Sequence, residues 1–330
     1  MSTTGRIPVL VVGGFLGSGK TSLLRHLLAG AADTAVIVNE FGAVGLDHQL
    51  LRACEERVEL LGGGCACCTR RADLVHALRD LLDAHDRGTA RLSRVVIETS
   101  GLADPAPILF TITNDPMLRH HFDVERLVVT VDAVNWPQQL GSHPEARKQV
   151  LVADELVITK LDLVEHEDEA GAATRATLRA LNPAASLKTA LQGVLGEEPP
   201  QAGQAPPVTH PAAEHASILA HTEDVSSLSL QPGRPVDWLG FAVWLSMLLH
   251  ARGQDVLRVK GLVELEDHTL VSVNGVQHVV HTPEHLSRGT ICDPTPGIVF
   301  ITRGLEIERL RASFDAFQRL ARSTNRLHAK

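Results

Sequence analysis

Residues 9–22 read VLVVGGFLGSGKTS, an apolar run followed by a glycine-rich stretch, a lysine and two hydroxyl residues. The apolar run Val9–Val12 predicts a buried strand, and the leucine spacing after Thr21 predicts a helix. A glycine-rich loop between a strand and a helix turns its backbone N–H groups toward a phosphate, at the positive end of the helix dipole. The stretch therefore predicts a phosphate-binding loop and, with it, an α/β fold.

The side chains of this loop suit a nucleoside triphosphate. Lys20 is long enough to reach the β- and γ-phosphates, and the Thr21 hydroxyl can bind Mg²⁺. A chance glycine-rich turn is the alternative, but it would not explain why strand, loop and helix follow in register. The predicted nucleotide-binding residues of the loop are Gly14, Gly17, Ser18, Gly19, Lys20, Thr21 and Ser22.

Two later strand ends add to the predicted site. Residues 95–101 read VVIETSG, so that Glu98 ends a strand where it can hold Mg²⁺ through water, and Gly101 lets a backbone N–H approach the γ-phosphate. We predict that Lys20, Thr21 and Glu98 form the catalytic group.

Residues 157–162 read VITKLD and favour guanine over adenine. Asp162 can accept two hydrogen bonds from guanine, while the stem of Lys160 can lie over the base. Adenine offers no matching donor pair, so GTP is the expected nucleotide. The alternative for Lys160 and Asp162 is a surface ion pair.

Three of the five cysteines fall in residues 62–69, which read GGGCACCT. The thiolates of Cys65, Cys67 and Cys68, with an oxygen from Glu40 after the second predicted strand, would give a tetrahedral site suited to Zn²⁺. Co²⁺ is less favoured by the affinity order of divalent ions. One cluster favours an exchangeable site over a structural one, which normally uses two separated pairs. A redox pair and inert buried cysteines are the alternatives.

The composition excludes several other classes. The chain has 330 residues, a net charge of −8, 3% aromatic residues and no tyrosine, which argues against a nucleic-acid-binding surface. No apolar run approaches the roughly 18–20 residues that cross a bilayer, and the first residues show no secretory pattern. We expect a cytoplasmic protein with neither a membrane nor a nucleic-acid partner.

Apolar strands alternate with helical patterns through the first part of the chain, which predicts a P-loop domain with a mainly parallel sheet over residues 1–192. Residues 193–222 are rich in Pro and Ala, contain histidine and predict a linker. Its histidines are interpreted as solvated loop residues or as a weak metal-collecting segment. Residues 223–330 predict a smaller α+β domain, in which Asn274-Gly275 is expected to form a tight hairpin turn.

The chain resembles the CobW family of metallochaperone GTPases. The resemblance lies in residues 13–21, 39–42 with Gly45 and Asp47, 64–69, 98–101 with Pro105, 257–261 and 303–305. It implies GTP hydrolysis, Zn²⁺ at Cys65, Cys67 and Cys68, and delivery of metal to a client metalloprotein. Two positions depart from the family. Thr159 replaces the usual Asn before Lys160, although its hydroxyl can still hydrogen-bond to the nucleotide, and Ala43 stands where many members carry an acidic residue.

Together these features predict a Mg²⁺-dependent GTPase whose release of Zn²⁺, or of Co²⁺, is coupled to the state of GTP. A zinc-sensing regulatory GTP-binding protein with little turnover is the main alternative. A small-molecule kinase is a third, but it would not explain Lys160 and Asp162. The sequence leaves open the client and the oligomeric state, including a homo-oligomer.

Overall fold

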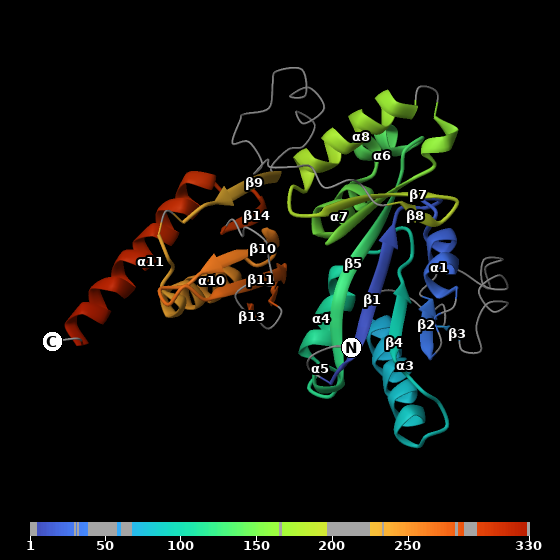
Figure 1. Ribbon diagram of the computed structural model, residues 1–330, viewed down its shortest axis with the longest axis horizontal. Helices are drawn as coiled ribbons and strands as arrows, with labels where there is room; N and C mark the ends of the chain where they lie inside the picture. The colour runs from blue at the N-terminus through green and yellow to red at the C-terminus, as the bar shows by residue number, and fades with distance from the viewer. Residues whose placement is uncertain are drawn as a thin grey trace. The chain divides into compact units, whose positions relative to one another are not determined.

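The computed structural model describes residues 5–29, 31, 33–38, 58–60, 68–164, 167–196, 225–232, 234–280, 283–286 and 296–328. The chain forms two compact units, one of Met1–Leu181 with Ala185–Pro200 and one of Gln201–Lys330 with Asn182–Ala184 (Figure 1). Most of the predicted linker lies outside the described residues. No helix in the described part of the chain has the length and apolar character that crossing a bilayer requires.

The first unit is built on an eight-stranded sheet in the order β3-β2-β4-β1-β5-β6-β7-β8. Every neighbouring pair is parallel except the last, β7 and β8, which is antiparallel. The predicted α/β class with a mainly parallel sheet is therefore confirmed. The strands are β1 (Ile7–Gly14), β2 (Thr34–Val38), β3 (Val58–Leu60), β4 (Arg94–Glu98), β5 (Phe122–Asp132), β6 (Glu155–Thr159), β7 (Ser186–Leu191) and β8 (Val194–Gly196).

Helices connect the parallel strands wherever the structure describes the connection, as parallel pairing requires. They are α1 (Lys20–Leu28), α3 (Cys68–Asp86), α4 (Ala106–Asn114), α5 (Leu118–His121), α6 (Trp136–Ser142), α7 (Pro144–Val152) and α8 (Glu167–Leu181), with a 3₁₀ turn, η1 (Leu161–Leu163). Helix α4 packs against α3, α5 and β5, whereas α7 packs against β1 and β5. Helix α3 begins at Cys68, and its first turn, Cys-Thr-Arg-Arg, shows no apolar spacing that would reveal a helix in the sequence.

The centre of this unit is β1, whose residues 9–12 are all fully buried. Leu10 and Val12 belong to a core cluster with Leu23 and Leu24 of α1. Successive side chains of a strand point to opposite faces, so the burial of Val9 and Val11 means that the other face is covered too. A continuous apolar strand is thus explained by a sheet buried on both sides.

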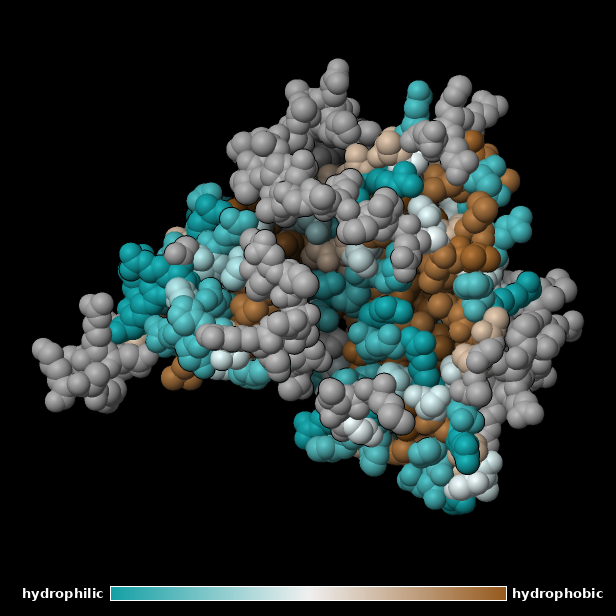
Figure 2. All heavy atoms as spheres, viewed as in Figure 1, coloured by the Kyte–Doolittle hydropathy of each residue, from teal (hydrophilic) through white to brown (hydrophobic). Residues whose placement is uncertain are grey.

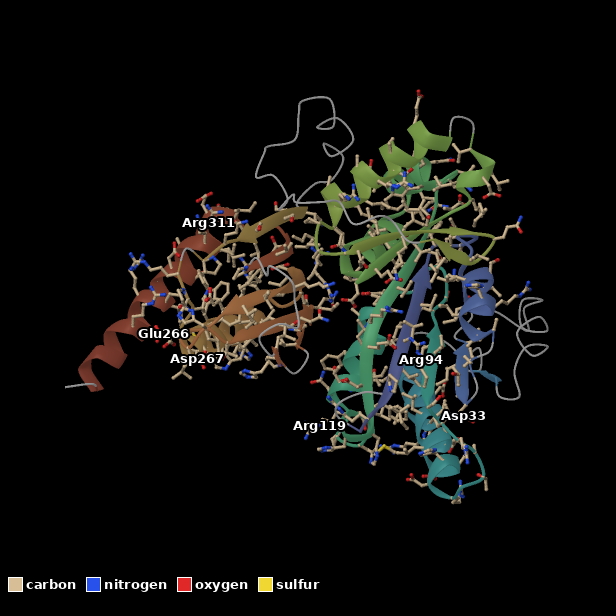
Figure 3. All side chains as sticks on the ribbon, viewed as in Figure 1. Asp33, Arg94, Arg119, Glu266, Asp267 and Arg311 are labelled. Carbon is tan, nitrogen blue, oxygen red and sulfur yellow. The ribbon has the colours of Figure 1, made fainter. Side chains whose placement is uncertain are left out.

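The amino ends of the strands are held by charged groups, opposite the end where the phosphate loop lies. Figure 3 labels Asp33, Arg94 and Arg119 at this end. Arg94 pairs with Glu125 at 2.6 Å, and Ser93 N–H donates to the Asp33 carbonyl at 2.7 Å. The Arg94–Glu125 ion pair is part-exposed, so it adds little stability.

The second unit contains an antiparallel sheet in the order β12-β11-β10-β14-β9, with β13 paired to β11. This matches the predicted smaller α+β domain. Its elements are β9 (Val225–Leu230), α10 (Trp238–Arg252), β10 (Val256–Glu264), β11 (Leu270–Val276), β12 (Val279–Val280), β13 (Glu284–Leu286), β14 (Gly297–Arg303) and α11 (Ile307–His328).

The hairpin predicted at Asn274-Gly275 forms three residues later. Asn274 and Gly275 lie within β11, opposite Lys260 and Val259 of β10. The turn falls at Gln277, which has a φ of 51°, and His278, between the paired Val276 and Val279. Pairing with the central strand β10 therefore overrides the local turn preference of Asn-Gly.

Aromatic rings fill the core of the second unit. The Trp244 ring lies 5.6 Å from Phe300 and 5.2 Å from Phe314, both edge-on, and its Nε1–H donates to Ser313 at 3.0 Å. Edge-to-face pairs add to the stability that burial alone provides. Figure 2 shows hydrophilic residues over the outward face of α11, as expected for a helix with one apolar face.

We predict that Trp244→Ala lowers the free energy of unfolding of the second unit by about 3–5 kcal/mol, because it leaves a cavity among aromatic rings. Urea unfolding followed by circular dichroism measures the change. The matched control is Leu239→Ala on the same helix, where the side chain is 72% exposed, and its cost should stay below about 0.5 kcal/mol. Equal costs for the two variants would contradict the core assignment.

Candidate nucleotide site

The phosphate loop occupies the residues between β1 and α1, as predicted. Gly14 ends β1 with a φ of 141°, and a Cβ there would lie 2.1 Å from the Thr130 hydroxyl oxygen. Only glycine fits this backbone and this space. Residues 14 to 19 therefore turn tightly into the first turn of α1, and the N–H groups at the start of a helix are suited to binding an anion.

Ser18 ties this loop to the two neighbouring strands. Its hydroxyl lies 2.6 Å from that of Thr130 at the end of β5, and its carbonyl accepts from the Thr159 hydroxyl at 2.8 Å at the end of β6. Ser18 and Thr130 are both 1% exposed. Buried hydroxyl groups at the ends of β5 and β6 thus hold the loop in place. Thr159, which is predicted to contact the nucleotide, also supports the loop backbone.

The three predicted catalytic side chains meet at the carboxyl ends of β1 and β4. Lys20 Nζ donates to the carbonyls of Gly14 at 2.9 Å and Phe15 at 3.1 Å, which places its ammonium group inside the loop. The Thr21 hydroxyl donates to Glu98 Oε1 at 3.3 Å. A hydroxyl and a carboxylate side by side are hard oxygen donors, and these are the ligands that Mg²⁺ prefers.

Gly101 lies directly against the loop. A Cβ at Gly101 would be 2.7 Å from the backbone nitrogen of Leu16. The segment after β4 is also anchored to β1, since Thr99 N–H donates to the Val12 carbonyl at 2.9 Å. The structure thus brings Gly101 together with the loop, which is where a γ-phosphate contact is predicted.

The residues predicted to read guanine follow β6. Lys160 takes a left-handed conformation with a φ of 59°, and its Nζ lies 2.7 Å from Asp132 Oδ2 at the end of β5. Asp162 is exposed on η1. The Lys160 stem is therefore held in place by Asp132, while the Asp162 carboxylate is accessible to a ligand.

Asp132 is buried, and its charge is stabilised by its neighbours. Burial alone raises the pKa of this carboxyl, but hydrogen bonds from Lys160 and Asn135, the charge of Lys160 and the Val134 N–H together hold the pKa below its ordinary value. Asp132 therefore remains an anion at neutral pH and orients the Lys160 side chain.

Three residues that the sequence did not single out also contribute to the site. Asp132 orients Lys160, Thr130 supports Ser18, and Gln149 of α7 donates to the carbonyls of Gly101 at 3.1 Å and Ala103 at 2.8 Å. Asp132 and Thr130 lie at the end of a buried strand, as Glu98 does. Their position after an apolar run could therefore have identified them as site residues from the sequence. No spacing pattern points to Gln149.

The predicted metal ligands Glu40, Cys65 and Cys67 lie outside the described residues, and Cys68 is described only as the first residue of α3. The zinc site stays a prediction. In the part of the chain that the structure covers, no three His, Cys, Asp or Glu side chains gather closely enough to hold a metal ion.

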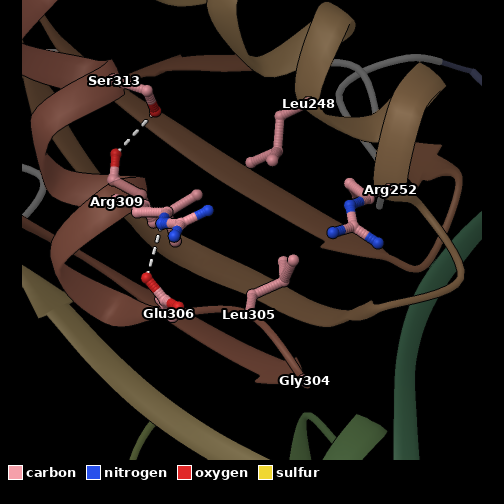
Figure 4. A pocket seen from close by; sticks show the side chains of 8 residues that line it. Leu248, Arg252, Gly304, Leu305, Glu306, Arg309 and Ser313 are labelled. Atoms are coloured by element: carbon pink, nitrogen blue, oxygen red, sulfur yellow. Dashed lines mark hydrogen bonds and ion pairs between the residues drawn. The ribbon is translucent and has the colours of Figure 1, made fainter.

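The second unit has a cavity of about 300 Å³ between the end of α10 and the start of α11 (Figure 4). Arg252 and Arg309 line it, but each is paired with a carboxylate, Asp255 and Glu306 respectively. The cavity therefore offers no uncompensated charge to a ligand.

The tight glycine loop, the lysine inside it, and the hydroxyl–carboxylate pair define a P-loop nucleotide-binding protein. Comparison with known proteins narrows this class. Residues 8–188 match the model of the CobW/HypB/UreG nucleotide-binding domain, and residues 225–318 match that of the cobalamin synthesis protein cobW C-terminal domain. The chain belongs to the CobW family and is a P-loop GTPase, as its sequence motifs predict.

One curated relative matches nearly the whole length of the chain, and another matches more than half of it. The chain is 32% identical to the zinc chaperone YjiA of Escherichia coli over 93% of this chain and 98% of the relative. It is 33% identical to the zinc-regulated GTPase metalloprotein activator 1 of Schizosaccharomyces pombe over 59% of this chain and 48% of that protein. A crystal structure of a Zn(II)-bound triple mutant of YjiA GTPase matches with a TM-score of 0.68 and 25% identity over 95% of this chain and 99% of the other.

We predict that Gly101→Ala weakens binding of a non-hydrolysable GTP analogue by at least about tenfold, because the added methyl group displaces the Leu16 backbone. Calorimetric titration measures the affinity. Gly141→Ala in α6 is the control, since nothing lies within 4 Å of its Cβ position. An unchanged affinity in Gly101→Ala would contradict the proximity of Gly101 to the nucleotide.

We also predict that Lys160→Met destabilises the protein by on the order of 1 kcal/mol at neutral pH, since a buried carboxylate loses a charged partner. The lowered pKa of Asp132 gives stability that is fully present above the unfolded pKa of about 4 and is lost as the pH falls through the folded value. Urea unfolding from pH 7 to pH 3 should therefore show the difference between wild type and variant shrinking below about pH 4. A difference independent of pH would exclude this ion pair as its cause.

Proposed function

We propose that this protein is a metal chaperone that binds Zn²⁺ at Cys65, Cys67, Cys68 and Glu40 and delivers it to a client metalloprotein, with release governed by GTP hydrolysis. The names of the relatives support zinc as the cargo, and Co²⁺ remains a second candidate ion. The single observation that carries the coupling is the contact between α3, which begins at Cys68, and α4, which follows the segment from Glu98 to Gly101.

The proposed nucleotide site is formed by side chains and backbone N–H groups at the carboxyl ends of the strands. Lys20 and the loop N–H groups bind the phosphates, and Gly101 N–H faces the γ-phosphate. Asp162 recognises guanine, with Lys160 against the base and Thr159 beside it. Thr21 and Glu98 would hold Mg²⁺, which would neutralise charge on the phosphate oxygens. Their separation of 3.3 Å fits shared coordination of one hard cation.

Two side-chain contacts join α3, which begins at Cys68, to α4 and to Asp115, the residue after α4. The Arg71 guanidinium lies 5.3 Å from the centre of the Phe110 ring, and Arg79 lies 3.8 Å from Asp115. Arg71 is one turn from Cys68, and Phe110 is in α4, which starts five residues after Gly101. A shift of the γ-phosphate segment that moves α4 would therefore move the first turn of α3.

We predict that the wild-type affinity for Zn²⁺ differs between the GDP state and the state with a non-hydrolysable GTP analogue by about 5- to 150-fold, the usual range of coupling between two sites. The same factor must relate the two nucleotide affinities with and without Zn²⁺. Calorimetric titrations of Zn²⁺ into both nucleotide states measure it. Equal Zn²⁺ affinities in the two states would eliminate the coupling.

Arg71→Ala tests the proposed route. This variant should bring the ratio of the two Zn²⁺ affinities toward one while GTP turnover without metal is retained. Arg87→Ala, after the end of the same helix, removes an exposed ion pair with Asp83 and should leave the ratio unchanged. If the ratio is the same in Arg71→Ala and in the wild type, the contact between Arg71 and Phe110 does not transmit the coupling between the two sites.

A further inference from the structure

Helix α7 touches both segments that face the phosphates. At its start, the His143 ring stacks on Phe15 of the phosphate loop with 4.7 Å between centroids. In its second turn, Lys148 pairs with Asp104 and Gln149 donates to the carbonyls of Gly101 and Ala103. One helix therefore holds the loop on one side and the Gly101 segment on the other.

Gln149 is unusual among these contacts because it is 1% exposed and binds backbone rather than a side chain. A carboxamide nitrogen has two N–H donors. Here they reach two carbonyls of the same turn, from a position 46 residues further along the chain. These two bonds fix the peptide planes that follow Gly101 and Ala103. The Gly101 N–H lies in the plane before Gly101, so it is held between this anchor and the one on its amino side.

The turn that Gln149 holds contains Gly101 and has two further anchors. On the amino side it is anchored by Thr99 N–H on Val12, and within the turn Ala103 N–H donates to the Ser100 carbonyl at 2.9 Å. The Gly101 N–H donates to no acceptor among the residues that the structure describes. Glycine has the widest conformational freedom of any residue, so its N–H direction depends on both anchors.

We propose that Gln149 is a positioning residue for GTP hydrolysis, which holds the Gly101 and Ala103 carbonyls so that the Gly101 N–H points toward the γ-phosphate. This inference rests on the proposed function in one respect, the contact of Gly101 with the γ-phosphate. Because GDP lacks that phosphate, loss of Gln149 affects the triphosphate and leaves the diphosphate unchanged. A residue that only supports the fold would affect both nucleotides.

The experiment compares the full-length wild-type protein with Gln149→Met, which keeps the length of the side chain and removes both donors. Calorimetry gives the dissociation constants of a non-hydrolysable GTP analogue and of GDP. We expect the dissociation constant of the GTP analogue to rise about tenfold, which corresponds to the loss of about one hydrogen bond to the γ-phosphate. The dissociation constant of GDP should stay within about twofold of the wild-type value. We also expect kcat for GTP to fall, and the melting temperature to drop by a few degrees because two carbonyls lose their donors.

Gln149→Glu provides a second readout. A glutamate faces the two carbonyls as an anion at high pH, and burial raises the pH at which it takes up a proton and becomes a donor. Its affinity for the GTP analogue, divided by the wild-type affinity at the same pH, should rise from pH 8 to pH 6. Gln149→Met should show no such recovery.

The outcomes separate the two proposals. Equal losses for both nucleotides, or no loss, in Gln149→Met would overturn the positioning role. If Gly101→Ala instead binds the GTP analogue as tightly as the wild type does, Gly101 does not contact the γ-phosphate. That result would overturn this part of the proposed nucleotide site, whatever the Gln149 variants show. A selective loss for the triphosphate in both variants supports both.

Discussion

The attachment of Ser18 to the ends of β5 and β6 is the constraint on which the nucleotide site depends. Two buried hydroxyls, Thr130 and Thr159, hold the middle of the loop at 2.6 and 2.8 Å. Because β1, β4, β5 and β6 are neighbours in one parallel sheet, their carboxyl ends bring Glu98, Asp132 and Lys160 to the same edge. The site thus follows from strand order, as is general for open α/β sheets.

The sequence predicts those parts of the fold whose signals are local. Four apolar residues before the loop and the leucines after it define β1 and α1, and Glu98 is found because it ends an apolar run. Features that depend on contacts between residues far apart in the sequence cannot be predicted in this way. Asn274-Gly275 favours a turn locally, but its pairing with β10 keeps both residues in the strand β11. Gln149 binds carbonyls far away in sequence, and the start of α3 is stabilised by Arg71 on Phe110 rather than by apolar spacing.

The two units carry different kinds of core. The first uses aliphatic side chains on both faces of its sheet, which suits parallel strands joined by helices. The second packs Phe241, Trp244, Phe300 and Phe314 between α10, α11 and its antiparallel sheet. The nucleotide chemistry lies in the first, while the family model for residues 225–318 assigns the second as the C-terminal domain of the same family.

The placement of the tryptophans has an optical consequence. The chain has three tryptophans and no tyrosine, and Trp238 and Trp244 both belong to the second unit. Trp136 is the single indole of the first unit, and it starts α6 directly after the turn in which Asn135 donates to Asp132. Its intrinsic emission is therefore a built-in reporter next to the Asp132–Lys160 pair, and removing the other two indoles would isolate that signal without any attached dye.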